Sequence, residues 1–218
     1  MVASGRVRVN GQVRINPQLR VHPERERITV DDHSVRRPVF EYLMLNKPAG
    51  VVTTRADECG RTTVYDLPGL GGRWLAPVGR LDRASRGLLL FTNDSQWADA
   101  ILAPDSKQEK VYRVRLDRAP TAAALDRCAA GVALEDGATL PARVRRVAHA
   151  TEHWIEIGLT QGRNRQVRRM FAALGYGVLE LVRTRIGALE LGTLAEGAVR
   201  RLTPAEVRAL AAKSRRRR

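Results

Sequence analysis

Apolar and polar residues alternate along several stretches of the chain, and this period of two predicts half-buried β-strands. In the stretch "KVYRVRL", for example, Tyr112, Val114 and Leu116 share one face and two arginines share the other. Two further stretches are apolar runs bounded by turn residues, which is the pattern of a fully buried strand. The strands predicted in these two ways are 39–48, 87–94, 110–116 and 154–160.

A period of 3.6 predicts helices between and after these strands. In residues 164–175, "NRQVRRMFAALG", apolar side chains recur at i, i+3, i+4 and i+7. A last helix is predicted near the C-terminus, where Thr203 is the N-cap and Glu206 follows three residues later, as in a capping box. Shorter helices are predicted at 95–103 and 121–131. Because the elements lack a regular βαβ rhythm, we expect an α+β fold with a mixed, mostly antiparallel sheet.

The first 33 residues differ in pattern from the rest. Alternation around Asn10-Gly11 predicts a tight hairpin, and strand-like pieces follow at 19–23 and 27–32. This segment has too little apolar material for a core of its own, and a short basic connection follows it. The parts we expect are an N-terminal segment at 1–34, a main domain at 38–210 and a basic tail at 211–218.

The composition argues against several classes of protein. The chain of 218 residues is 44% hydrophobic but contains no apolar run of about 18 residues. Its first residues lack the apolar stretch of a signal peptide, so we expect a cytoplasmic protein without membrane contact. Cys59 and Cys128 have no paired spacing and the four histidines are scattered, which predicts neither disulfides nor a metal site.

The charge of the chain adds a positive indication of function. A net charge of +15 points to a polyanionic partner such as nucleic acid. All but four of the 38 basic residues are arginine, and part of that choice can reflect the compositional bias of a genome. Such a bias does not by itself place base in excess of acid, so a nucleic-acid partner is favoured.

Four arginines crowd the start of the helix predicted over 164–175: Arg163, Arg165, Arg168 and Arg169. An amphipathic helix needs a solvated face, which is one explanation of them. No acid lies among them, however, and like charges one turn apart repel unless a polyanion or a buried acid compensates them. The crowding favours RNA or DNA phosphates.

Asp82 lies between Arg80 and Arg83 at the start of a predicted buried strand. It is either a structural acid that pairs with these arginines or a functional carboxylate that positive charge keeps ionised, and the charge pattern does not decide. Tyr112 is likewise either a core residue or a ring that stacks on an unstacked base. Lys47, which precedes a proline, either ends a strand or positions a loop near a cleft.

Seven stretches taken together resemble one family. They are, in order, "YLMLNKPAGVVTT", "GRTTV", "PVGRLDRASRGLLLFTND", "EKVYRV", "GRNRQVRRMFAALG", "LVRTRIGALEL" and "GAVRRLTPAE". This set is similar to the bacterial ribosomal-RNA pseudouridine synthases of the RsuA/RluB/RluE/RluF group. The N-terminal segment resembles the second half of an alpha-L RNA-binding module, without the two helices that normally precede it.

The resemblance implies a pseudouridine-synthase-like fold, with the sheet in two lobes around a central cleft and a truncated alpha-L-type segment before it. It implies conversion of uridine to pseudouridine in ribosomal RNA or a pre-ribosomal particle, with no cofactor and no metal. The oligomeric state is left open by the sequence, and a monomer is expected by default. Asp82 would be the essential carboxylate, Tyr112 would pack on the flipped base, and Arg163 would pair with the aspartate. The residues then expected to contact RNA are Arg80, Arg83, Lys47, Arg165, Arg168 and Arg169.

Two further matters are left open by the sequence. The carboxylate can stabilise charge at the anomeric carbon, bond to that carbon or take the sugar's 2′ proton. The chain can also be a non-catalytic RNA-binding or ribosome-assembly factor with the same fold, although the set of Asp82, Tyr112 and Arg163 favours an enzyme. A DNA-binding protein is disfavoured because no helix-turn-helix or other duplex-reading motif is evident.

Overall fold

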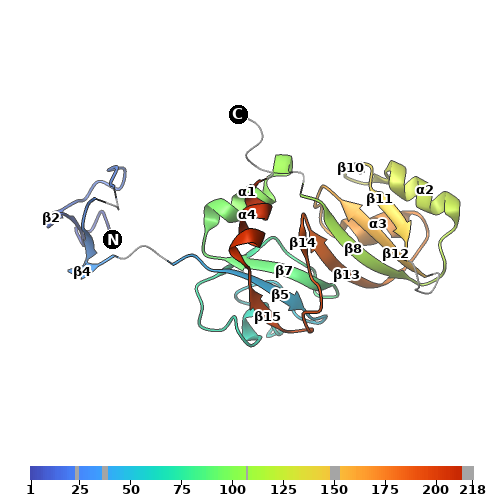
Figure 1. Cartoon of the computed structure of the whole chain (residues 1–218), viewed down its shortest axis with the longest axis horizontal. Coiled ribbons are helices and arrows are strands. Elements are labelled where there is room, and N and C mark those ends of the chain that lie inside the picture. Colours follow the sequence, from blue (N-terminus) through green and yellow to red (C-terminus); the bar gives the residue numbers. More distant parts are fainter. Residues whose placement is uncertain (23–24, 36–38, 107, 148–152, 213–218) are drawn as a thin grey trace. The chain divides into compact units, whose positions relative to one another are not determined.

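Two compact units make up the chain in the computed structural model, Met1–Phe40 and Glu41–Arg218 (Figure 1). The residues that the structure describes are 1–22, 25–35, 39–106, 108–147 and 153–212. Within this part of the chain, no helix is long and apolar enough to cross a membrane. The two units are described separately.

The first unit is a four-stranded antiparallel sheet in the order β2-β1-β3-β4. Its strands are β1 (Val7–Val9), β2 (Gln12–Val13), β3 (Ile28–Val30) and β4 (His33–Ser34). Asn10 and Gly11 join β1 to β2 with φ of 51° and 83°, so the predicted hairpin is confirmed. The strand predicted at 19–23 is wrong for residues 19–22, because these residues pair with no strand. Residue 23 lies outside the described residues. The identity of this unit as an alpha-L-type module stays a prediction.

The second unit contains a nine-stranded sheet with the main path β11-β12-β8-β13-β7-β5-β15, while β14 pairs with β13 and β6 pairs with β7. Its strands are β5 (Tyr42–Lys47), β6 (Ala76–Val78), β7 (Arg86–Thr92), β8 (Lys110–Leu116), β11 (Arg143–Arg146), β12 (Trp154–Leu159), β13 (Val178–Ile186), β14 (Leu189–Glu190) and β15 (Val199–Arg201). The pairing of β13 with β7 is parallel and the other pairings of this sheet are antiparallel. The expectation of a mixed, mostly antiparallel sheet is confirmed.

In the described part of this unit, four α-helices cover parts of the sheet. They are α1 (Ser95–Leu102), α2 (Ala122–Ala130), α3 (Gln166–Ala173) and α4 (Pro204–Ala212). A separate hairpin, β9 (Ala133–Leu134) and β10 (Gly137–Ala138), follows α2. The predicted capping box of α4 is confirmed, since the amide of Glu206 donates to Oγ1 of Thr203 at 3.2 Å and the amide of Thr203 donates to the Glu206 carboxylate at 2.8 Å.

The parallel pair β7–β13 joins two halves of the sheet, which Figure 1 shows with α1 and α4 in one half and α2 and α3 in the other. Gly87 makes this junction possible. Its φ is 102°, and a Cβ at this position would lie 2.2 Å from the carbonyl oxygen of Arg183. A residue with a side chain would therefore push the two strands apart. The pairing of β7 with β13 places Arg183 directly beside Gly87. The position of Arg183 is used again below, in the description of a second cavity.

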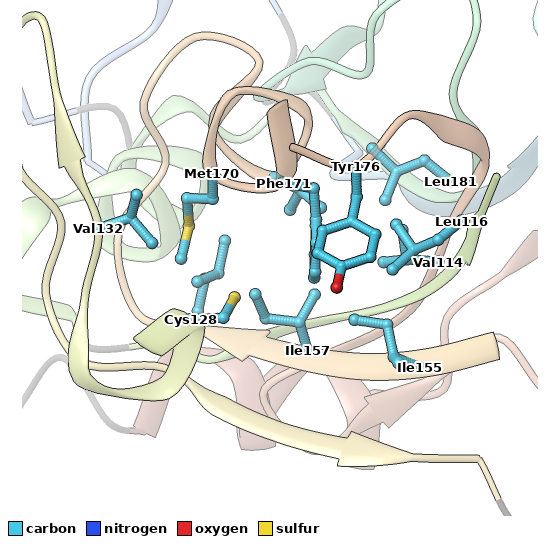
Figure 2. Close-up of a cluster of buried hydrophobic side chains, with 12 residues drawn as sticks. Val114, Leu116, Cys128, Val132, Ile155, Ile157, Met170, Phe171, Tyr176 and Leu181 are labelled. Atoms are coloured by element: carbon cyan, nitrogen blue, oxygen red, sulfur yellow. The ribbon is translucent and has the colours of Figure 1, made fainter. Parts of the chain in front are cut away.

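Three clusters of buried apolar side chains fill the two halves. One lies between α2, α3 and the strands β8 and β12, and Figure 2 shows it with Cys128, Ile157 and Phe171 among its members. The other two lie in the half that contains β5 and β7. Tyr112 packs against clusters in both halves, so it lies at their junction.

Candidate active site

Asp82 lies in the loop between β6 and β7, and this loop is fixed on both sides of it. The hydroxyl of Ser85 donates to Oδ1 of Asp82 at 2.8 Å, and the amide of Ser85 donates to the Asp82 carbonyl at 3.1 Å. On the other side Leu81 is buried, and its carbonyl accepts a hydrogen bond from the hydroxyl of Thr53 at 2.9 Å. The carboxylate is therefore held in place by its own loop.

Two arginines of the α3 segment form ion pairs with this carboxylate. Nη1 of Arg165 lies 3.5 Å and Nε of Arg168 lies 3.6 Å from Oδ2 of Asp82. The Arg168 side chain is 12% exposed and also donates to the carbonyls of Val178, at 2.9 Å, and Ala84, at 3.3 Å. The Arg165 side chain is 50% exposed. Arg168 is the more rigidly held of the two partners.

The expected ion pair between Asp82 and Arg163 is replaced by a different one in the structure. The guanidinium of Arg163 donates to the carbonyls of Gly137 and Ala138, each at 2.7 Å, and lies 3.5 Å from the carboxylate of Asp136. Arg163 therefore binds the turn of the β9–β10 hairpin. Its side chain still lines the cavity described next, so a role near the substrate stays a prediction.

A cavity of about 390 Å³ opens beside Asp82. The residues of interest on its wall are Arg80, Asp82, Tyr112, Arg163, Arg165 and Leu181. Asp82 comes from the β6–β7 loop and Tyr112 from β8, so segments far apart in sequence meet here. A volume of this size falls within the usual range for small-molecule sites.

Acids that are distant in sequence pair with the crowded arginines. Such pairing was one of the two explanations that the sequence allowed, and contact with RNA phosphates was the other. Asp136 pairs with Arg163 and with Arg169, while Asp82 pairs with Arg165 and Arg168. The Arg169 guanidinium, through its hydrogen bonds, holds the pKa of Asp136 below the usual range. The arginines of this segment thus form ion pairs within the protein. RNA contacts by Arg165, Arg168 and Arg169 stay predictions.

The expected contact between Lys47 and RNA is wrong, because Lys47 is 0% exposed. Its ammonium donates to the carbonyls of Pro48 and Ser85, each at 2.9 Å. Burial lowers the pKa of Lys47 to about 8. Lys47 therefore braces the loop that carries Asp82. Arg80 and Arg83, by contrast, are exposed and available to a ligand.

Sequence reasoning missed Arg168 as the buried partner of Asp82 and missed Asp136. Arg165 precedes α3 with a left-handed backbone (φ 46°), so helical spacing gave no signal that it and Arg168 reach the same carboxylate. No spacing could indicate Asp136, which reaches the helix from another hairpin. Among the described residues, no group of three or more His, Cys, Asp or Glu side chains could hold a metal ion.

Known proteins are similar to this chain in fold and in sequence. A crystal structure of a pseudouridylate synthase superimposes with a TM-score of 0.72 and 33% identity, covering 96% of this chain and 90% of the other. The family model for RNA pseudouridylate synthases matches residues 41–173. The chain belongs to the RNA pseudouridylate synthase family, whose members are isomerases.

Named relatives lie within the same family. Ribosomal large subunit pseudouridine synthase B of Bacillus subtilis is 35% identical over 215 residues, which are 97% of this chain and 88% of the relative. The protein of the same name from Pasteurella multocida is 39% identical over 202 residues, 88% of this chain and 57% of the relative. The chain thus spans little more than half of the second relative.

Proposed function

We propose that this protein converts one uridine of large-subunit ribosomal RNA to pseudouridine, with Asp82 as the carboxylate on which the reaction depends. Membership in the RNA pseudouridylate synthase family supports the reaction. The names of the relatives from Bacillus subtilis and Pasteurella multocida support the large ribosomal subunit as the source of the RNA.

The observation that carries the role of Asp82 is its position in the cavity. One oxygen of the carboxylate accepts from Ser85, while Arg165 and Arg168 lie beside the other. The two cations attract this oxygen and fix the direction of the carboxylate. An aromatic ring, Tyr112, lines the same cavity. A carboxylate that served structure alone would gain nothing from facing a cavity with an aromatic wall.

The reaction begins with access to the base. A uridine in folded RNA must leave its stack, which costs a few kcal/mol that stacking and hydrogen bonds in the cavity must offset. The ring of Tyr112 can stack on the flipped uracil. Arg80, exposed on the rim, can occupy the place that the nucleotide leaves or bind the adjoining backbone.

The isomerisation itself needs no added reactant. The bond from N1 of uracil to C1′ of the ribose breaks, the uracil turns, and C5 bonds to C1′. The proton on C5 is then lost and N1 gains one, so that atoms and electrons balance. The carboxylate of Asp82 can stabilise positive charge at C1′, bond to C1′ for a time or take the 2′ proton. Tyr112 is suited to help remove the C5 proton.

Mapping tests the function directly. Pseudouridines are mapped in ribosomal RNA from a strain that has the gene and from one that lacks it, and the purified protein is then added to the unmodified RNA. We expect one large-subunit uridine to lose its modification without the gene and to regain it with the protein. Identical maps, with no conversion by the purified protein, would instead indicate a non-catalytic RNA-binding factor. The cytoplasmic location and the monomeric state stay predictions.

A further inference from the structure

We propose that a second cavity, next to that of Asp82, binds a phosphodiester group of the RNA strand beside the target uridine, through Arg183 and Lys110. This inference rests on the proposed function. The cavity has a volume of about 770 Å³. Its wall shares Gly79, Arg80, Tyr112 and residues 161–163 with the cavity of Asp82, so the two are neighbours.

The pairing of β8 with β13 sets the two cations on one face. Arg183 lies directly opposite Tyr112 in the antiparallel register, and opposed residues share a face of the sheet. Lys110 precedes Tyr112 by two residues and therefore points to the same side. All three residues line the second cavity. A strand of RNA whose base stacks on Tyr112 would carry its backbone past this pair.

Arg183 is buried with part of its guanidinium unused. The residue is 4% exposed, and Nε donates to the carbonyl of Leu88 at 2.7 Å. Nη2 is buried as well and has no hydrogen-bond partner among the described residues. Leaving such a donor unpaired is costly, and the cost is largest for a charged group. Arg183 itself is a wall residue of the second cavity, which a ligand can enter.

Lys110 adds a second cation without an acid to balance it. Burial lowers its pKa, and the nearby charge of Arg183 lowers it further. No ion pair involves Lys110 or Arg183 within the described part of the chain. Asp82, on the wall of the neighbouring cavity, already pairs with Arg165 and Arg168. The positive charge here is therefore uncompensated.

The opposite face of the same sheet provides the contrast. Arg115 pairs there with Glu180, and Arg143 and Arg145 pair with Glu156. Arg115, Arg143 and Arg145 thus have acids beside them, whereas the wall of the second cavity carries no acid for Arg183 and Lys110. An arginine that is paired with an acid needs no ligand to balance its charge. An uncompensated pair is suited to an anion with two accessible oxygens, which a phosphodiester supplies.

The rest of the wall fits a nucleotide. Nε2 of Gln161 is buried without a hydrogen-bond partner among the described residues, and Gln161 lines both cavities. Leu102 and Leu140 are exposed on this wall and offer apolar surface to a ribose or a base. The second cavity thus combines cations, a free amide donor and apolar contacts, which are the groups that bind a nucleotide next to its phosphate.

The test couples one phosphate to one side chain. A set of RNA fragments that contain the target uridine is made, each with a single uncharged methylphosphonate in place of one phosphate. Affinities are measured for the wild-type protein, for Lys110→Gln and for Arg183→Lys. Arg113→Gln is the control, since Arg113 is exposed on the other face of β8. Binding is measured without turnover, and pseudouridine formation is followed separately.

We expect Lys110→Gln to weaken binding of unmodified RNA roughly ten-fold and to reduce the slope of log Kd against log salt by about 0.7–0.9. At one phosphate next to the target, the methylphosphonate should weaken the wild type but not Lys110→Gln, while Arg113→Gln should respond as the wild type does. If the methylphosphonate weakens RNA binding by the same factor in the wild type and in Lys110→Gln at every position, the phosphate site is refuted. If the coupling is present but the wild type forms no pseudouridine, the proposed function fails and the phosphate site stands.

Discussion

Nε of Arg168 lies 3.6 Å from a carboxylate oxygen of Asp82, and Arg168 is also bonded to two main-chain carbonyls. One of these carbonyls belongs to Ala84, in the loop that carries Asp82, and the other belongs to Val178 at the start of β13. Arg168 therefore connects α3, β13 and the loop that carries Asp82. This geometry makes it the arginine that fixes the direction of the carboxylate.

The variant Arg168→Gln tests this relationship against Arg165→Gln. Loss of Arg168 leaves two carbonyls without their donor and removes the more buried of the two cations beside the Asp82 carboxylate, so we expect the free energy of unfolding to fall by about 2 kcal/mol. Turnover at saturating RNA should fall roughly a hundred-fold or more, because Asp82 loses its orientation. Urea denaturation and single-turnover assays measure the two effects.

Arg165→Gln is the matched control, because its side chain is half exposed and makes an ion pair with the same oxygen. An exposed pair is worth less than about 1 kcal/mol, so the change in stability should be small and turnover should fall less than in Arg168→Gln. If Arg165→Gln abolished turnover and Arg168→Gln did not, the assignment of the two arginines would have to be reversed.

Arg163 and Asp136 should behave as one unit. The guanidinium of Arg163 binds the Asp136 carboxylate and the carbonyls of the β9–β10 turn. We expect Arg163→Gln to lower turnover a few-fold through misplacement of this wall of the cavity, with Asp136→Asn having a similar effect and the double variant no greater one. Turnover rates of the wild type, the two single variants and the double variant complete this double-mutant cycle. Abolished turnover in Arg163→Gln, with wild-type activity in Asp136→Asn, would return Arg163 to a direct catalytic role.

Tyr112→Phe separates stacking from proton transfer. The ring still packs against both halves of the core, so the fold and the affinity for RNA should be retained. Without the hydroxyl, we expect turnover to fall roughly 10²–10⁴-fold if Tyr112 helps to remove the C5 proton. Binding and single-turnover measurements on the same RNA distinguish the two effects. Normal turnover in Tyr112→Phe would limit Tyr112 to stacking.

Glu206 should make stability depend on acid pH. Its hydrogen bonds with Arg200 lower the pKa of Glu206 from 4.5 to about 2. The folded-state pKa lies below the unfolded one, so this contribution is present above about pH 4.5 and is lost as the pH falls toward 2. The Glu206 side chain is 27% exposed, so solvent screening reduces the contribution to about 1–2 kcal/mol.

The measurement compares wild type with Glu206→Gln by urea denaturation at pH 6 and pH 3. The wild type should lose about 1 kcal/mol more than the variant between these two values, because at pH 3 part of the contribution of Glu206 is still present. Equal losses of unfolding free energy in the two proteins would mean that the carboxylate of Glu206 does not stabilise the folded state.

Local patterns predicted the elements that alternate cleanly, and tertiary packing decided the rest. The face of β8 that carries Tyr112 and the capping box of α4 followed from spacing alone. β13 was not predicted, since register shifts at Val178/Glu180 and Arg183/Arg185 interrupt its period of two.

The sequence predicted which residues belong to the site better than it predicted which of them pair with one another. Asp82 and Tyr112 could be selected from the sequence, and the structure brings both to one cavity. The arginine that pairs with Asp82 could not be selected, because four arginines lie within seven residues and the way α3 packs decides which of them reaches the loop. Lys47 looked available for RNA, but its position on a central strand buries it.

The central claim is tested most directly by Asp82→Asn on unmodified ribosomal RNA. The amide oxygen of asparagine can still accept the hydrogen bond that Ser85 donates to Asp82, so the variant should fold and bind RNA. We expect no detectable pseudouridine under conditions in which the wild type completes its reaction. Pseudouridine formation by Asp82→Asn at a rate near that of the wild type would contradict the assignment of Asp82 as the catalytic carboxylate.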